Sequence, residues 1–200
     1  MKDDRRARDV KSSILDAADR MLASRGYKKM TIDDLAAAVG IGKGSVYLHF
    51  SSKEEIALSH IDAIIERLKT RLHEISQTSA PYDERVREML IERVMFRFDS
   101  VQHYTQSLND LLSKIRPGLI ERRKRHFEEE SRIFARIIQS GVDEGSFASA
   151  NVDDTARSLL LATNSLLPFS LSARELGERN EIEKRISSLA DLLLKGLVSR

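Results

Sequence analysis

Residues 43–49 carry side chains of the kinds that could read the edges of nucleic-acid bases. Their sequence is Lys-Gly-Ser-Val-Tyr-Leu-His, followed by Phe50. If this segment is a short helix with Val46 and Phe50 turned inward, its outer side offers a cation, several hydrogen-bonding groups and an apolar contact. The outward residues are then Lys43, Ser45, Tyr47, Leu48 and His49. This combination suits a DNA major groove, where base edges present donors, acceptors and methyl groups.

Neighbouring residues could hold the phosphates beside such a groove. Backbone N–H groups at the starts of short helices bind anions, and Thr31 and Lys53 could assist them. These contacts would fix the pose without reading sequence. Gly44, like Gly42, has no side chain to offer a base, so we expect part of the specificity to come from DNA shape. Asp33 would repel a nearby phosphate unless a cation intervenes.

Two earlier helices have to brace this short segment, because isolated helices of fewer than about 12 residues rarely persist in water. The apolar spacing predicts the first helix over residues 12–25, with Ser12 or Ser13 as its cap and Gly26 as its left-handed stop. Gly40 ends the second helix. The inward positions of the first helix are Ile14, Leu15, Ala18, Met21 and Leu22.

The helices on either side of the short segment have recognisable starts. Thr31 can accept a hydrogen bond from the Asp34 amide, which predicts the start of the second helix. Ser51 or Ser52 caps the helix that follows, and apolar residues continue its pattern to Ile75. No Gly/Ser-rich linker interrupts this long helix, so we expect a rigid rod through which movement can be transmitted.

Composition and charge fit a folded helical protein. The chain has 200 residues, 41% hydrophobic and 32% charged, and no long alternation of apolar and polar residues indicates a strand. It has no cysteine, which excludes disulfides and cysteine nucleophiles. The net charge is only +2, and the basic excess lies in residues 1–54. Neither a membrane span nor a signal peptide is visible, so we expect a cytoplasmic location.

The remainder of the chain indicates five more helices, which gives about nine in all and an all-α fold. Their limits are set by Pro81, a turn at 116–118 (Arg-Pro-Gly), a loop at 141–150 and Gly177. The expected helices are 83–99, 103–114, 118–140, 153–172 and 181–198.

The middle helices concentrate large apolar groups and a few polar ones that could orient a small molecule. Ordinary core packing explains such aromatic residues at least as often, so both interpretations stay open. The candidate pocket residues are Met89, Arg93, Phe96, Tyr104, His126, Phe127 and Asn164.

Other features argue against an enzyme and against a bound metal or cofactor. The charged run at 121–130 is explained by ion pairs four residues apart on one helix. His126 and Glu130 share that spacing, but no other ligands cluster with them in the sequence. No phosphate-binding glycine loop or nucleophile elbow is present.

The last two helices carry more leucine and isoleucine than one helix pair needs for its own core. Paired with a second copy of the chain, they would close a four-helix bundle. The alternative is that these residues only complete the core of one chain. The candidate dimer-interface residues are Leu159, Leu166, Ile182, Ile186, Leu189 and Leu193.

The N-terminal third resembles the signature of the TetR family of transcriptional regulators. The resemblance runs through residues 26–27 (GY), 30–36 (MTIDDLA) and 39–55 (VGIGKGSVYLHFSSKEE). It implies a helix-turn-helix DNA-binding domain at 1–55 and a ligand-binding, dimerising domain at 56–200. It also implies phosphate contacts for Tyr47 and Lys53, and groove contacts for Lys43, Ser45 and Leu48.

The function that follows is a dimeric regulator, expected to be a repressor. It would bind a pseudo-palindromic operator in double-stranded DNA and be released by a small apolar or amphipathic effector. The alternative is a helical small-molecule-binding or scaffold protein without specific DNA binding; an all-α enzyme has the least support.

Overall fold

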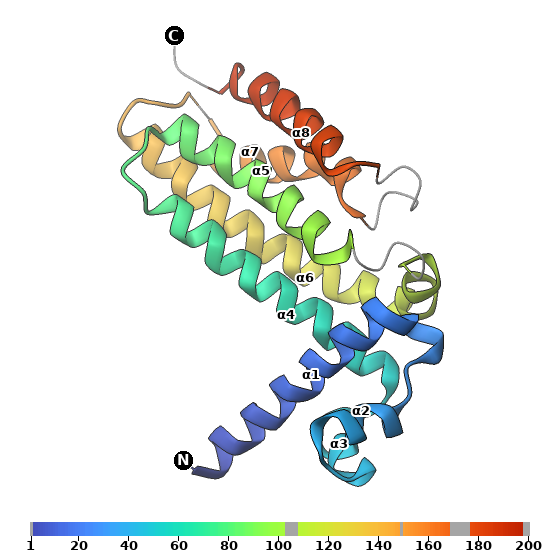
Figure 1. The fold of residues 1–200 in the computed structure, drawn as a ribbon. Coiled ribbons are helices and arrows are strands. Elements are labelled where there is room, and N and C mark those ends of the chain that lie inside the picture. The colour runs from blue at the N-terminus through green and yellow to red at the C-terminus, as the bar shows by residue number, and fades with distance from the viewer. Residues whose placement is uncertain (1, 103–107, 149, 169–176, 198–200) are drawn as a thin grey trace. The chain divides into compact units, whose positions relative to one another are not determined.

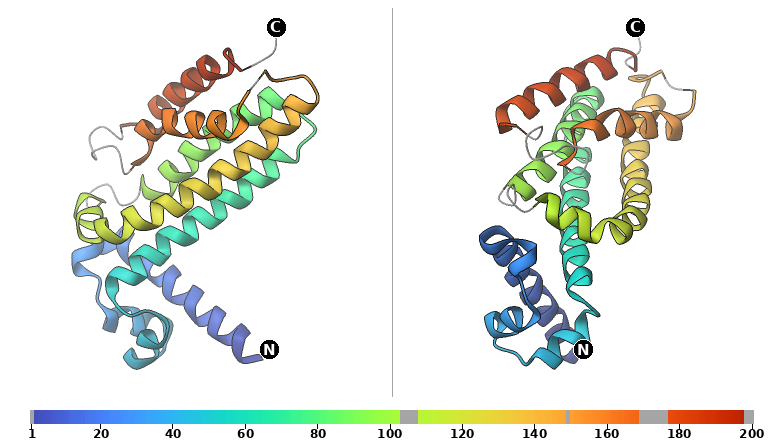
Figure 2. Two further views of the ribbon diagram at one scale, coloured as in Figure 1. Left: turned by 180° about the vertical axis from the view of Figure 1, so that it is seen from behind. Right: turned by 90° about the vertical axis from the view of Figure 1, so that its right-hand side faces the viewer.

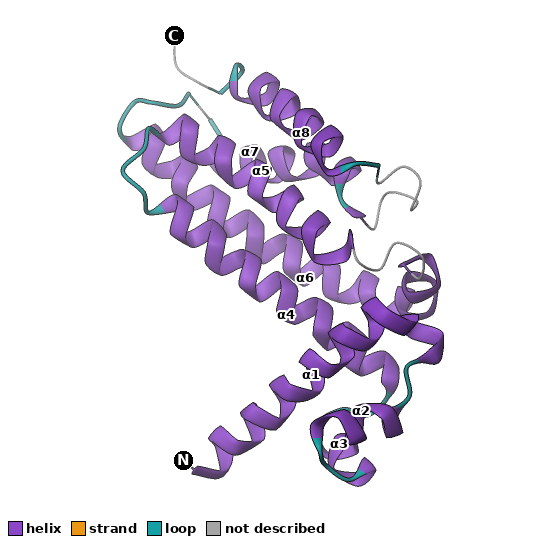
Figure 3. Cartoon of the chain, viewed as in Figure 1, coloured by secondary structure: helices purple, strands orange, loops and turns teal. Residues whose placement is uncertain are grey.

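The computed structural model describes residues 2–102, 108–148, 150–168 and 177–197. In these ranges the chain forms eight α-helices, joined by loops and one short 3₁₀ turn (Figures 1 and 3). The predicted all-α fold is confirmed. Among the described helices, none combines the length and the apolar character needed to cross a membrane.

The chain divides into two compact units. The N-terminal unit comprises residues 1–63 and 103–121, and the C-terminal unit comprises residues 64–102 and 122–200. The described segment 108–121 therefore groups with the first helices, although it follows α5 in the sequence. A functional boundary at residue 55 stays a prediction.

The first helix, α1 (Lys2–Lys29), begins much earlier than predicted. The predicted caps at Ser12 and Ser13 are wrong, because Ser13 lies inside the helix and its hydroxyl donates to the Asp9 carbonyl at 2.8 Å. Residues 2–9 are almost all charged, so the apolar spacing used to predict the helix could not indicate that it begins there. At Gly26 a φ of +73° interrupts the helix as expected, but its ψ of 166° lies outside the left-handed helical region.

The next two helices begin and end where their local chemistry predicts. The start of α2 (Ile32–Val39) is capped by Thr31, whose Oγ1 accepts from the Asp34 amide at 3.1 Å. Its end is Gly40, in the left-handed conformation with φ 74° and ψ 33°. The third helix, α3 (Lys43–His49), stops at Phe50. The buried side chains around these helices include Ile14, Ala18, Leu22, Leu35, Val46, Phe50 and Ile56.

The long helix α4 (Lys53–Ser76) begins in the N-terminal unit and continues into the C-terminal unit without a loop. Ser52 caps it, because the Glu55 amide donates to the Ser52 hydroxyl at 3.0 Å. The predicted cap and the predicted length of this helix are both confirmed.

The C-terminal unit is built around three helices that run side by side: the second half of α4, α5 (Tyr82–Val101) and the later part of α6 (Leu108–Asp143) (Figure 2). Against α5 pack α7 (Val152–Thr163) and α8 (Arg179–Leu194). A 3₁₀ turn, Asn164–Leu166, follows α7 directly. The shared core includes Leu68, Leu72, Met89, Leu90, Phe134, Ile138 and Leu160.

The predicted break at 116–118 is wrong, because α6 continues through Pro117. Proline removes one helical N–H and its ring crowds the carbonyl four residues earlier, but packing can outweigh this local penalty. Leu111 and Ile115, just before the proline, are buried. A Cβ on Gly118 would lie 2.6 Å from Leu58 Cδ1, so the glycine serves close packing of α6 against α4 rather than a turn. In the described part of the chain, eight helices thus stand where nine were expected.

Candidate nucleic-acid interface

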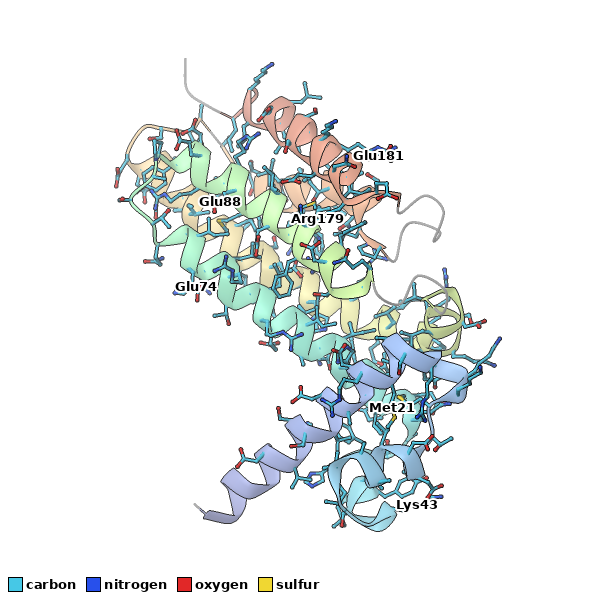
Figure 4. All side chains as sticks on the ribbon, viewed as in Figure 1. Met21, Lys43, Glu74, Glu88, Arg179 and Glu181 are labelled. Atoms are coloured by element: carbon cyan, nitrogen blue, oxygen red, sulfur yellow. The ribbon has the colours of Figure 1, made fainter. Side chains whose placement is uncertain are left out.

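The outer side of α3 is open to solvent, as predicted. Tyr47 is 49% exposed and Leu48 84% exposed. Half of the Lys43 side chain is exposed as well, and Figure 4 labels this residue on the ribbon. Ser45 and His49 are half-buried at the margins. Val46 and Phe50 are buried on the opposite side. One short helix therefore presents a cation, a phenol and an apolar side chain together.

Lys43 forms an ion pair with Asp33, the acid that was expected to repel a nearby phosphate. Its Nζ lies 2.8 Å from Asp33 Oδ2. The hydrogen bond to Asp33, together with the charge of that carboxylate, raises the pKa of Lys43. The cation predicted to shield Asp33 is therefore Lys43 itself. As a result, the pair adds no net charge to the surface that would face a phosphate.

Thr31 and Lys53, the predicted phosphate contacts, already have partners in the N-terminal unit. The Thr31 hydroxyl donates to Asp34 Oδ2 at 2.8 Å in addition to accepting the cap hydrogen bond. Lys53 Nζ donates to the carbonyls of Tyr27 and Met30 at 3.0 and 3.1 Å. It also lies 4.3 Å from the centre of the Tyr27 ring. Both residues brace the unit, and their contact with phosphates stays a prediction.

The start of α3 leaves the backbone uncovered. A Cβ on Gly42 or on Gly44 would meet no described atom within 4 Å. The packing of the described residues therefore does not require glycine at either position. The open backbone would let a binding partner approach closely.

A second group of predicted residues meets in the core of the C-terminal unit. Arg93 is 2% exposed, and its Nε lies 2.8 Å from Glu130 Oε2. Its terminal nitrogens donate to Thr163 Oγ1 at 2.7 Å and to Asn164 Oδ1 at 2.9 Å. Arg97 donates to the same Glu130 carboxylate. Two of the candidate pocket residues, Arg93 and Asn164, therefore meet here. The sequence analysis did not name Glu130, Thr163 or Arg97 as their partners; the available signal was the four-residue spacing of Arg93 and Arg97, which places both on one side of α5.

The opposite charges in this buried network offset the effect of burial on the pKa values of Arg93 and Glu130. Burial lowers the pKa of Arg93 to about 10, although the charge of Glu130 opposes this effect. Burial would raise the pKa of Glu130, but the charges of Arg97 and Arg93 outweigh it and lower the pKa. Arg93 and Glu130 are therefore both ionised at neutral pH.

The other candidate pocket residues have mixed positions. Met89 is fully buried in the core, and Phe96 and Phe127 pack against it. Tyr104 lies outside the described residues. His126 is buried in a group with Glu66 and Glu129, whose ligand atoms all lie within 4.8 Å of one another. Lys69 Nζ contacts both carboxylates of that group, so the cluster contains its own cation.

Comparison with known proteins identifies the family. Residues 14–59 match the model of bacterial regulatory proteins of the tetR family, and residues 117–189 match that of the tetracyclin repressor-like C-terminal domain. The chain belongs to the TetR family of transcriptional regulators. It is thus a helix-turn-helix regulator from a family that binds DNA operators and is not enzymatic.

Individual TetR relatives agree with this assignment. The chain is 29% identical over 144 residues to the HTH-type transcriptional repressor KstR2 of Mycobacterium tuberculosis, which covers 68% of each protein. A transcriptional regulator from Cytophaga hutchinsonii has a similar structure, with 22% identity, 93% and 97% of the two chains covered, and a TM-score of 0.77. A TetR-family regulator from Pectobacterium atrosepticum is also similar in structure. The sequence identity is 21%, 98% of this chain and 97% of the other are covered, and the TM-score is 0.75.

The predicted dimer residues of this TetR regulator divide into two groups. Leu159, Ile182 and Ile186 are 5%, 0% and 0% exposed. These three side chains pack into the core of the chain itself, and their assignment to a dimer contact stays a prediction. Leu166, Leu189 and Leu193 are half-buried. Among the described residues of α7 and α8, the most exposed leucines are two others, Leu161 at 59% and Leu192 at 66%.

Proposed function

We propose that this TetR regulator is a dimeric repressor that reads a pseudo-palindromic operator with α3 of each copy. Residues 1–55 form the DNA-binding domain, and residues 56–200 bind the effector and the second copy. The observation that carries the proposal is the exposed outer side of α3, whose opposite side is anchored by Val46 and Phe50. The relatives named as repressors support the direction of regulation.

Each exposed residue of α3 has a contact suited to its chemistry. Lys43 can donate to the guanine O6 and N7 acceptors, and Leu48 can contact a thymine methyl group. Tyr47 can donate its hydroxyl to a phosphate, which fixes the register of the helix in the groove. Ser45 and His49 can add hydrogen bonds at the margins. With so few direct readers, DNA shape contributes the rest of the specificity.

Dimerisation supplies the two-fold symmetry that a pseudo-palindromic operator requires. The exposed leucines of α7 and α8, Leu161 and Leu192, support these helices as the surface that pairs with a second copy. Two helices from each copy would form a four-helix bundle with these leucines inside it. The two DNA-binding domains would then occupy successive major grooves.

The effector binds in the C-terminal unit beside the Arg93–Glu130 network. The surrounding core is apolar, and the network supplies polar groups that can orient an apolar or amphipathic molecule. Because α4 passes from one unit into the other, a ligand that tilts α4 would change the spacing of the two α3 helices. Such coupling is typically about 1–3 kcal/mol and requires different affinities for the two forms.

Selection from random DNA duplexes by the purified full-length chain tests the proposal. We expect enrichment of an inverted repeat, bound less tightly by Tyr47→Ala and by Lys43→Gln. Lys124→Gln is the matched control, because Lys124 is an exposed lysine on α6, outside both α3 and the proposed dimer surface. If no sequence is enriched, or if Tyr47→Ala binds as well as the native chain, the protein is instead a helical ligand-binding or scaffold protein.

A further inference from the structure

A hollow of about 270 Å³ lies in the C-terminal unit where α4 ends and α5 begins, beside the later part of α6. Figure 1 shows the loop that joins α4 to α5 at this end. The described lining includes no acidic residue. Its polar side chains include His73, Ser76, Tyr82, Arg85, Arg136 and Ser140. Two guanidinium groups, an imidazole and several hydroxyls thus surround one space.

Arg85 in this lining has an unused donor. Its Nη1 donates to the Ser76 carbonyl at 2.9 Å, and its guanidinium lies 4.1 Å from the centre of the Tyr82 ring. These two contacts fix the orientation of the group. Its Nε, however, is buried and has no hydrogen-bond partner among the described residues. A buried charged donor without a partner is costly, and a bound water or ion is the usual explanation.

Two carboxylates have their own hydrogen-bond or ion-pair partners, one of which, Tyr82, belongs to the lining. Glu144 accepts a hydrogen bond from the Tyr82 hydroxyl at 2.7 Å. Glu74 pairs with Arg71 at 3.0 Å. Neither acid lines the hollow. The positive charge of Arg85 and Arg136 is therefore not neutralised by the described lining itself, which favours an incoming anion.

We propose that this hollow binds a small phosphate-type oxyanion, either inorganic phosphate or the phosphate group of a small metabolite. Guanidinium groups bind such anions with strong, charge-assisted hydrogen bonds. Arg85 Nε and the Arg136 guanidinium are the principal donors, and His73 adds a third from α4. Donors from three helices suit a tetrahedral anion better than a flat carboxylate. The site uses no residue of α3 or of the Arg93–Glu130 network.

The full-length chain, titrated with sodium phosphate at constant ionic strength, tests this site. The readouts are the NMR signal of the Arg85 Nε–H group and calorimetry. We expect a saturable shift of that signal. Arg136→Gln and Arg85→Lys should each weaken phosphate binding by about tenfold or more, the effect of losing one charge-assisted hydrogen bond. A phosphorylated metabolite, glycerol phosphate, distinguishes inorganic phosphate from an organic phosphate by its affinity.

Two matched controls separate this site from general attraction of anions. Arg132→Gln removes the same charge one turn earlier on α6, in a second hollow that Arg136 also lines but Arg85 and His73 do not. Lys43→Gln removes a cation from the DNA-reading surface. Both should retain native phosphate affinity. The proposal is overturned if the Arg85 signal does not saturate, if Arg132→Gln weakens binding as much as Arg136→Gln, or if acetate binds as tightly as phosphate. Arg136 is exposed, so we expect Arg136→Gln to fold. This variant therefore tests the phosphate site even if Arg85→Lys unfolds.

Discussion

The pairing of Asp33 with Lys43 predicts that an acid restrains the attraction of this regulator for DNA in general. Asp33→Asn removes the negative charge 2.8 Å from Lys43 Nζ and leaves the reading cation unpaired. In the native chain the pair contributes no net charge, so bringing it to a phosphate releases no counterion. In the variant Lys43 can neutralise a phosphate and release one. Non-specific affinity at low salt should therefore rise.

The magnitude follows from counterion release. Each phosphate neutralised steepens the dependence of log K on log salt by about 0.9, so two copies of α3 add about 1.8. Raising the salt from about 50 to about 200 mM should then weaken binding by about twelvefold more than in the native chain. Fluorescence anisotropy with a random-sequence duplex, repeated over this range of salt, measures the slope.

Asp153→Asn is the matched control for this experiment. Asp153 holds the same position after the cap of α7 as Asp33 holds after the cap of α2, so both variants lose an equivalent helix-end charge. Only Asp33→Asn should steepen the slope. Adding Lys43→Gln to Asp33→Asn should return it to the native value. An unchanged slope in Asp33→Asn, or an equal change in Asp153→Asn, would refute the reasoning.

Three further outcomes are expected. Thr31→Ala should lower the free energy of unfolding in urea by about 1 kcal/mol through loss of the helix cap, as should Asn151→Ala, which removes the equivalent cap of α7. Glu130→Ala should cost about 3–5 kcal/mol because it leaves buried guanidinium groups unpaired, whereas Glu128→Ala, which breaks an exposed ion pair, should cost about 1 kcal/mol or less. The folded pKa of Glu130 lies below its ordinary 4.5. Its stabilising contribution is therefore present above pH 4.5 and is lost as the pH falls through the folded pKa. Urea unfolding at several pH values should show that acid lowers the free energy of unfolding less in Glu130→Ala than in the native chain. Leu192→Glu should convert a dimer to monomers in sedimentation equilibrium while helical circular dichroism is retained, and loss of the helical signal would contradict the surface role of this leucine.

The parts of the fold that depend on local chemistry could be predicted from the sequence. The cap at Thr31, the left-handed glycine at Gly40 and the cap at Ser52 each involve residues within a few positions of one another. They gave both limits of α2 and the start of α4 correctly. Ser13 shows the limit of this approach: serine suits a cap, but it also fits inside a helix when its hydroxyl bonds to the carbonyl four residues earlier.

The parts that depend on distant contacts could not be predicted. Pro117 and Gly118 form a turn signal by themselves, and the contact of Gly118 with Leu58 is visible only in the fold. The candidate DNA site shows the same limit. Its exposed residues followed from the inward positions of Val46 and Phe50, but the pairing of Lys43 with Asp33 joins two helices.

The leucines of α8 show why a dimer surface is hard to read from apolar spacing alone. Residues four apart lie on one side of a helix, and Ile182, Ile186 and Ala190 use that spacing to face the chain's own core. Leu192 falls outside this set and is 66% exposed. The apolar stripe is therefore wider than the core of one chain covers. An isoleucine that faces the core and a leucine that faces solvent look alike in sequence. Exposure separates them in the fold, and for this reason the proposed dimer contact rests on Leu192 rather than on Ile186.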